Sequence, residues 1–360
     1  MTDTKPPDLL VPERSIGWGI FRIVRPAWWG VALIGLATLF FTSTLGALNV
    51  YVYDQILLAC MGAIALQLLL GTAGLVSIGN SAFLLVGAFS AVFALRSGIA
   101  FPFDLIFATV ISGVAGLIAS LPSLRIRSLF LALSTLAVYY LAVFFGNLYQ
   151  VHGGPVASAA GFQIPTLFAS QGLDGSGRDW AWFLFGCLAV IILGTSRLMR
   201  ERSGRAFRMI RDHEFIAPTL GIPVFRYKLT VFVITSMVIG FEGALMAHFT
   251  GIISTDSFTV TLAFQYIAMI VIGGLDSIVG AIIGAVIVIG LPTWVPIIIG
   301  PLVGSTNATI DGPNIALIIY GVLVILFVVS SPDGTVGLLR TMRRFALRVG
   351  RRLRRQEVSQ

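Results

Sequence analysis

Chemically reactive side chains are scarce in this sequence of 360 residues. Two cysteines and three histidines are too few for a disulfide scaffold or for a metal centre built from Cys and His ligands. Both cysteines, Cys60 and Cys187, lie in apolar runs and are expected to be small buried side chains. Redox chemistry is therefore not indicated.

Charged residues are also sparse, and this limits the class of protein. Only 11% of the residues are charged, 57% are hydrophobic and the mean hydropathy is +0.94. One soluble core cannot bury this much apolar surface. We therefore predict an all-α integral membrane protein, in which little chain remains for a soluble catalytic domain.

The motifs of several enzyme classes are missing. A phosphate-binding loop needs Gly-Lys-Ser/Thr, but the two lysines, Lys5 and Lys228, follow Thr4 and Tyr227. The sequence also lacks a His-Glu-x-x-His zinc motif and a Gly-x-Ser-x-Gly nucleophile motif. We expect no catalytic residues, no metal site and no cofactor bound by this chain.

About ten apolar stretches are suitable for transmembrane helices. They cover residues 28–48, 53–70, 82–95, 105–121, 129–148, 180–198, 229–249, 262–273, 278–299 and 313–329. This division predicts a cytoplasmic tail over 1–27, a membrane domain over 28–330 and a basic cytoplasmic tail over 331–360.

The distribution of basic residues supports this topology, because Lys and Arg collect on the cytoplasmic side of a membrane protein. With both termini in the cytoplasm, all 24 Lys and Arg residues except Arg96 and Arg178 fall in cytoplasmic segments. The net charge of +8 is then explained by topology and by attraction to anionic lipid headgroups. Nucleic acid is not an expected partner.

Glycine and small hydroxyl residues interrupt the apolar sequence at two cytoplasmic turns, 71–81 and 273–280. Such segments predict either close helix packing or a broken helix. Unwound backbone at membrane depth needs protein or a water-filled cavity around it, so a break points to a substrate path. The sequence Gly-Leu-Asp-Ser-Ile at 274–278 also resembles Gly-Leu-Val-Ser-Ile at 74–78, which suggests an internal repeat.

Glu242 lies near the middle of the seventh span, with no basic residue one turn away. A carboxyl group at this depth is costly unless it is paired or hydrated. Glu242 is therefore expected either to be protonated and packed between helices or to face a cavity and contribute to transport. We expect His248 to lie at the interface, and Asp54 and Asp104 to cap helix starts.

The candidate residues of a substrate path lie in these segments and in the helix that follows the first of them. They are Gly74, Ser77, Gly79, Asn80, Phe83, Phe89, Glu242, Gly273 and Gly274.

A basic connection over 199–228 joins the sixth and seventh spans. Its apolar residues predict short amphipathic helices that end at Gly221. A helix of this kind serves either as an interfacial anchor or as a docking piece for a soluble partner.

Several blocks of sequence, in a consistent order, make the chain resemble the LivM-type permease subunits of branched-chain amino-acid ABC transporters. The blocks are 74–83 with 87–89, 124–136, 153–154 with 161–165, 204–221, 227–228, 243–245, 273–275 and 331–334.

The resemblance implies a multi-pass subunit of an ATP-driven importer in a bacterial inner (plasma) membrane. Its implied partners are a LivH-like second permease, two cytoplasmic ABC ATPases that use ATP and Mg, and an extracytoplasmic solute-binding protein. The translocation path would run between the two permeases, and the loop would be the coupling helix. The positions implied for ATPase coupling are Arg205, Arg211, Glu214, Ala217 and Gly221.

The sequence departs from the family pattern at several positions. It has Asn80 where His is common, Phe89 for Tyr, His152 for Thr, Pro218 in the coupling region and Glu242 in place of a small residue. These departures leave open whether the substrate is Leu, Ile and Val, another amino acid, urea or a short amide. The principal alternative is an ion-coupled secondary transporter that uses Glu242, and an intramembrane enzyme is the less favoured alternative from another class, because the sequence shows no cluster of acid, base or metal-binding residues.

Overall fold

The computed structural model describes residues 31–32, 34–40, 47–123, 128–152, 162–163, 178–275, 277–303 and 321–322. The predicted tails, 1–27 and 331–360, lie outside these residues. So do parts of the first predicted span and the tenth span apart from residues 321–322.

The described chain is built from apolar helices that coincide with the second to ninth predicted spans. They are α2 (Ala47–Leu66), α3 (Asn80–Arg96), α4 (Phe103–Ser123), α5 (Ser128–His152), α6 (Arg178–Arg200), α8 (Val224–Thr250), α9 (Val260–Gly273) and α10 (Ile278–Val303). Six helices in the described part are long and apolar enough to cross a membrane, while α3 and α10 have shorter apolar stretches. The all-α membrane class is confirmed, and the count of ten remains a prediction.

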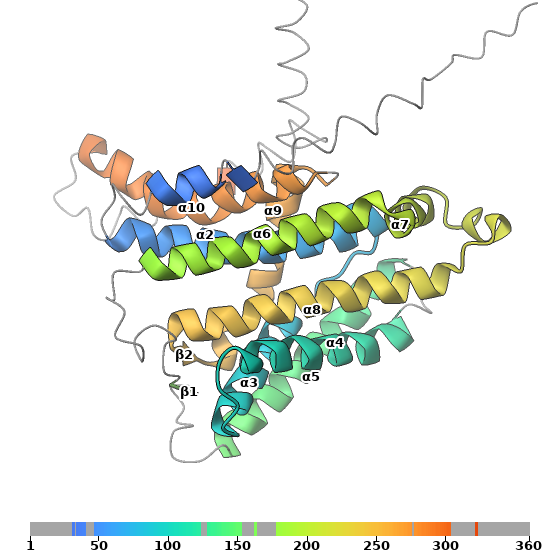
Figure 1. Ribbon diagram of the computed structural model, residues 1–360, viewed down its shortest axis with the longest axis horizontal. Helices are drawn as coiled ribbons and strands as arrows, with labels where there is room; N and C mark the ends of the chain where they lie inside the picture. The colour runs from blue at the N-terminus through green and yellow to red at the C-terminus, as the bar shows by residue number, and fades with distance from the viewer. Residues whose placement is uncertain are drawn as a thin grey trace, which may run out of the picture.

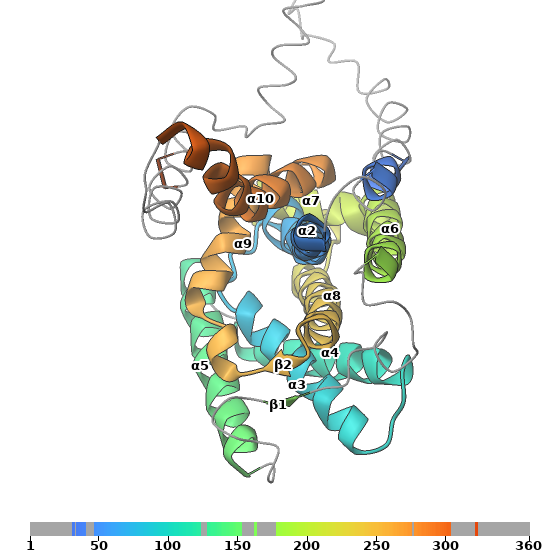
Figure 2. The same ribbon diagram turned by 90° about the vertical axis from the view of Figure 1, so that its left-hand side faces the viewer.

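These helices form two layers. Figure 1 shows α2, α6 and α10 in one layer and α3, α4, α5 and α8 in the other, with α9 running between the layers. In the view of Figure 2, α2 lies in the middle. In the most apolar stretch of α2, 89% is buried inside the protein, whereas in that of α5 the share is 22%. High burial is expected of α2, because a helix that is apolar on all sides belongs in the interior.

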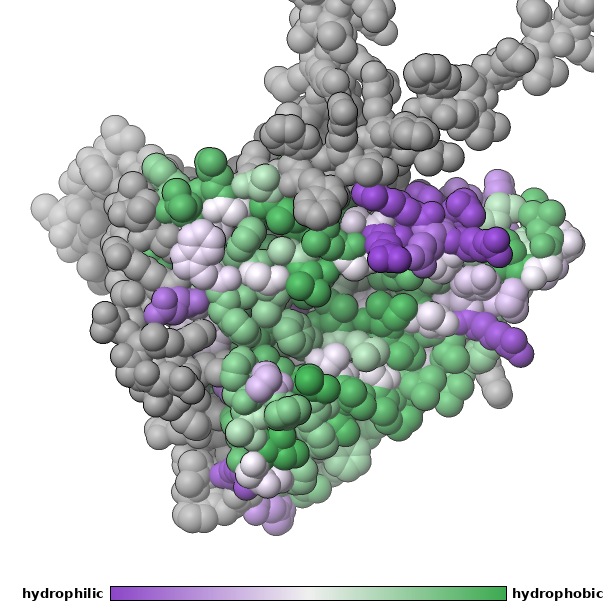
Figure 3. All heavy atoms as spheres, in the orientation of Figure 1, coloured by the Kyte–Doolittle hydropathy of each residue, from purple (hydrophilic) through white to green (hydrophobic). Residues whose placement is uncertain are grey.

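The two ends of the bundle differ in structure. At one end, the short strands β1 (Phe162–Gln163) and β2 (Ile252–Ile253) pair antiparallel, with Phe162 opposite Ile253. At the opposite end lies α7 (Arg202–Asp212), followed by a 3₁₀ turn over Ala217–Leu220 (Figure 1). We call these the β end and the α7 end. Hydrophobic side chains cover most of the described flank in Figure 3, and hydrophilic ones gather around α7.

Small residues bring α8 close to the helices beneath it. A methyl group added at Gly87 of α3 would overlap the carbonyl group of Gly240 on α8, and one at Gly243 would overlap that of Leu84. Lipid tails are as apolar as the helix surfaces, so close van der Waals packing of this kind holds transmembrane helices together. It fixes α8 closely against α3.

Candidate functional site

The first predicted break lies between α2 and α3. The helix α2 ends in a π-helical turn over Gln67–Thr72, and the backbone is then non-helical until α3 begins at Asn80. Gly74 has a φ of +71°, which only glycine adopts without strain. Its N–H donates to the carbonyl oxygen of Leu70 at 3.2 Å.

The remainder of this segment is attached to α5. The N–H of Ile78 donates to Oγ1 of Thr135 at 3.1 Å, and that of Gly79 donates to Oγ of Ser77 at 3.3 Å. The backbone N–H groups of Gly74 and Gly79 thus have partners within the chain. They offer no donors to a substrate in this conformation.

The second predicted break, between α9 and α10, also begins with a glycine of positive φ. Gly274 has a φ of +111° and follows the last residue of α9. Oγ of Ser277 accepts from the N–H of Gly280, three residues ahead, at 3.3 Å, whereas Ser77 accepts from Gly79, two residues ahead. The two five-residue sequences thus share the positive φ of their glycine but not the hydrogen bond of their serine, and Asp276 lies outside the described residues.

The two breaks lie against each other, which sequence reasoning did not predict. Nε2 of Gln67 donates to the carbonyl oxygen of Leu275 at 3.1 Å. A methyl group at Gly71 would overlap that same oxygen. The end of α2 and the turn before α10 therefore form one contact at the α7 end.

The helix α7 packs on this end through its apolar face. Ala206, Phe207 and Ile210 are buried, and the ring of Phe207 meets that of Tyr227 edge-on at 5.9 Å. The basic side chain of Arg205 points to the exposed face, while Nη1 of Arg211 donates to the carbonyl oxygen of Gly71. The predicted amphipathic helix is confirmed, and one of its arginines reaches the first break.

Beyond α7, the chain forms an apolar tip. Ala217 is fully buried and Gly221 ends the 3₁₀ turn. Glu214 forms an ion pair with Lys228 at 2.5 Å. The exposed tip residues are Phe215 (92% exposed), Leu220 (63%) and Ile216 (50%). The sequence predicts an amphipathic helix that includes these residues, whereas the structure places Phe215 and Ile216 in an exposed turn before the 3₁₀ turn.

The aromatic candidates of α3 lie in the packed interior. Phe83 is 2% exposed and contacts the ring of Phe232 edge-on at 5.7 Å. Phe89 meets Tyr149 at 6.2 Å. Asn80 is buried at the start of α3, and its Nδ2 has no partner among the described residues. In this conformation Phe83 and Phe89 join α3 to α8 and α5.

Glu242 lies where α2, α8 and α9 meet. The hydroxyl group of Tyr266 donates to Oε1 of Glu242, whereas Oε2 has no partner in the described chain. A methyl group at Gly62 of α2 would overlap the carboxyl group. Glu242 is 1% exposed, so this geometry matches the first of the two sequence interpretations, a carboxyl group packed between helices.

Three other polar side chains differ from the sequence expectations or refine them. Asp104 lies in the first turn of α4, as predicted, and shares a hydrogen bond with His248 of α8. His248 lies in the last turn of α8, and its side chain is buried (1% exposed), so its place at the membrane interface stays a prediction. The capping role of Asp54 is wrong: α2 begins at Ala47, which leaves Asp54 buried inside the helix.

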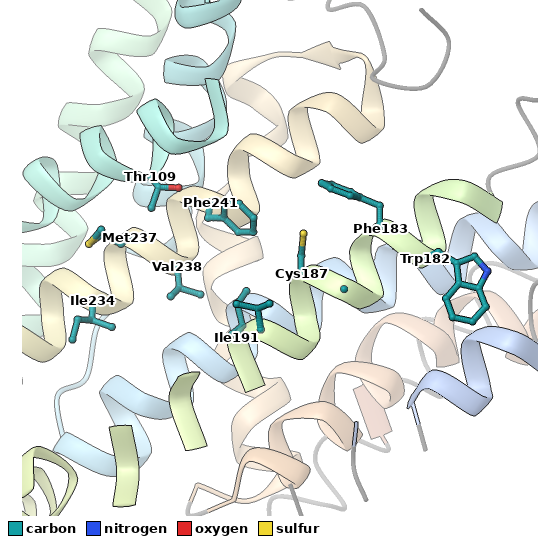
Figure 4. Close-up of a pocket in the computed structure, with 11 residues that line it drawn as sticks. Thr109, Trp182, Phe183, Cys187, Ile191, Ile234, Met237, Val238 and Phe241 are labelled. Carbon is teal, nitrogen blue, oxygen red and sulfur yellow. The ribbon is translucent and has the colours of Figure 1, made fainter. Parts of the chain in front are cut away.

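An apolar groove opens between α6 and the pair α4 and α8. Its volume is about 840 Å³, and Figure 4 shows Phe183, Cys187 and Ile191 of α6 facing Val238 and Phe241 of α8. The groove contains no charged side chain. Its lining is separate from the two breaks and almost entirely apolar, with Thr109 and Trp182 as its residues that carry a hydroxyl or an indole N–H group.

Comparison with known proteins agrees with the resemblance to LivM-type permeases. The family model described as branched-chain amino acid transport system / permease component matches residues 47–328. The high-affinity branched-chain amino acid transport system permease protein LivM of Salmonella typhimurium is 28% identical over 303 residues, which cover 77% of this chain and 67% of the relative. LivM of Escherichia coli is 27% identical with the same coverage.

A relative with a different printed substrate also matches. The autoinducer 2 import system permease protein LsrC of an Enterobacter species is 27% identical over 236 residues, which cover 61% of this chain and 66% of the relative. Comparison with solved structures gave no match.

Proposed function

The chain belongs to the family of permease components of branched-chain amino acid transport systems, and on this premise we propose that it is the membrane subunit of an ATP-driven importer. The observation that carries the proposal is the family match over residues 47–328, which includes both helix breaks and the basic loop. The α7 end is then the cytoplasmic side of a bacterial inner membrane. The translocation path runs along the interface with a second, LivH-like permease.

The proposed substrates are branched-chain or related amino acids. Two relatives are named for branched-chain amino acids, which supports this class. Urea and short amides are the alternative within the same transporter type, and the LsrC relative adds autoinducer 2 as a compound to test. An extracytoplasmic solute-binding protein delivers the substrate at the β end.

The apolar tip is the proposed docking point for the cytoplasmic ATPases, which bind the ATP and Mg. Exposed aromatic and aliphatic side chains are the usual anchors of protein interfaces. Phe215, Ile216 and Leu220 provide such anchors, and the Glu214–Lys228 ion pair and the buried Ala217 hold the turn that presents them.

The substitution Phe215→Asp tests this role. A charge placed in a buried apolar contact is costly, so we expect loss of the ATPases from the affinity-purified complex and at least about a tenfold loss of affinity. The matched control is Ile252→Asp, which makes the same change at an exposed residue of the β end (54% exposed). Equal ATPase recovery from both variants and from the parent would overturn the docking role.

The buried geometry of Glu242 does not favour ion-coupled secondary transport. An ion-coupling carboxyl group needs a hydrated route. Glu242 instead lies among α2, α8 and α9 and accepts a hydrogen bond from Tyr266.

A further inference from the structure

Arg211 links the basic loop to the first helix break. Its Nη1 donates to the carbonyl oxygen of Gly71, which is 140 positions away in sequence. Its aliphatic stem lies against Gly74, where an added Cβ would be 2.8 Å from Cγ of Arg211. The side chain is 33% exposed, and its Nε also donates to Oδ1 of the neighbouring Asp212 at 3.3 Å.

The acceptor of this hydrogen bond is a carbonyl group at the end of a helix. The last carbonyl groups of a helix lack intrahelical partners, and cationic side chains near them are favourable. Gly71 belongs to the final π-helical turn of α2, and the absence of a side chain there lets the backbone of Leu275 come close. Arg211 of α7 therefore supplies a hydrogen-bond donor for a carbonyl group at the end of α2.

The same turn of α2 contacts the second break. Gln67 donates to the carbonyl oxygen of Leu275, which directly follows Gly274. Arg211, the end of α2 and the turn before α10 thus form one continuous contact.

We propose that Arg211 is a positioning residue that transmits movement of the cytoplasmic loop to the two helix breaks. This inference rests on the proposed function, in which the ATPases move the loop. Phe207 and Ile210 are buried on the apolar face of α7, and the ring of Phe207 contacts that of Tyr227 at the start of α8. Packed apolar surfaces between α7 and its neighbours can slide, whereas the hydrogen bond from the guanidinium group to Gly71 is directional and fixes α7 to one point of α2.

A cysteine reporter in the first break tests this role without knowledge of the substrate. Val76 lies in the non-helical segment and is 36% exposed, so Val76→Cys in a background of Cys60→Ala and Cys187→Ala supplies a single thiol. Its rate of reaction with N-ethylmaleimide is measured on the intact complex in membrane vesicles, with and without ATP and vanadate. Recovery of the ATPases is measured on the same samples.

Three variants separate the contact from a general loss of charge. Arg211→Met removes the cation but keeps a stem of similar length, and Arg211→Lys keeps a cationic donor. Arg202→Met removes the same charge from the exposed first turn of α7. We define the labelling ratio as the rate with ATP and vanadate compared with the rate without them. We expect this ratio to differ from unity by at least about 5-fold in the parent and in Arg202→Met, which is the lower end of typical allosteric coupling. In Arg211→Met the labelling ratio should fall to near unity, and Arg211→Lys should restore part of the difference.

The outcomes distinguish this inference from the proposed function. A parental ratio in Arg211→Met overturns the role of Arg211, as does a ratio of unity in a parent that retains its ATPases. A parent that recovers no ATPase overturns the proposed function itself. Loss of the ratio in Arg211→Met with normal ATPase recovery supports transmission through this contact, because misfolded protein would lose both.

Discussion

Glu242 and Tyr266 share a hydrogen bond at a point where three helices meet, and both side chains are buried. In such a site an acceptor for the tyrosine hydroxyl group stabilises the packing, whereas a hydroxyl group without a partner is costly. We therefore propose that Glu242 serves helix packing rather than proton movement.

Substitution of Glu242 tests this assignment. Glu242→Gln keeps an oxygen acceptor for Tyr266, so we expect leucine uptake by proteoliposomes containing the whole complex to stay within about twofold of the parent. Glu242→Leu removes the acceptor and should destabilise the protein by about 1–3 kcal/mol, measured by thermal unfolding in detergent. Loss of uptake in a stable Glu242→Gln protein would instead point to ion coupling.

The buried pair Asp104 and His248 gives a second prediction. Removal of one member leaves the other unpaired, so Asp104→Leu or His248→Leu should each destabilise the protein by about 3–5 kcal/mol. The double substitution should cost less than the sum of the two, because no unpaired polar group remains. Additive losses in thermal unfolding measurements would mean that the two side chains do not interact.

Sequence reasoning located these polar residues but not their partners. The pairs Asp104–His248 and Glu242–Tyr266 are separated by 144 and 24 positions, and each joins two helices. Which faces of two helices meet depends on how closely their small residues allow them to approach, and the hydropathy pattern does not report this. The apolar run likewise predicts that this helix begins at residue 53, whereas α2 begins at Ala47, so Asp54 lies inside the helix and not at its start.

At the scale of elements, the glycine-rich segments were predicted as either packing faces or breaks, and they combine both features. Gly74 and Gly274 have positive φ values and follow the ends of helices, while Gly71 is a point of close backbone contact. The composition of a segment predicts such permissive backbone. It does not predict that two segments about 200 positions apart meet, because that contact depends on the order of helices in space.

Gly74 and Gly98 form a matched pair for a prediction at this scale. Both have positive φ values, of 71° and 82°, but an added Cβ at Gly98 would meet nothing within 4 Å, whereas one at Gly74 would meet Arg211. Gly98→Ala and Gly74→Ala should share a backbone cost of about 1–2 kcal/mol. Gly74→Ala alone should also reduce ATP-dependent uptake of leucine by proteoliposomes containing the complex. Equal uptake by the two variants would show that the contact of Gly74 with Arg211 does not matter.

At the scale of the whole molecule, the described helices place the two breaks, the basic loop and the apolar tip at one end and the paired strands at the other (Figure 1). Alternating chain direction, predicted from the distribution of Lys and Arg, accounts for this arrangement. The family match and this polarity fit a subunit that receives solute on one side and is driven from the other.

The central claim, that this chain is one membrane subunit of an ATP-driven importer, is tested most directly by its native partners. The chain should be affinity-purified from native membranes in mild detergent, and the mass of the intact complex should be determined. The account predicts one copy of this chain with a second permease and two P-loop ATPases, and substrate-stimulated ATP hydrolysis. An isolated chain that transports solute without these partners would contradict it.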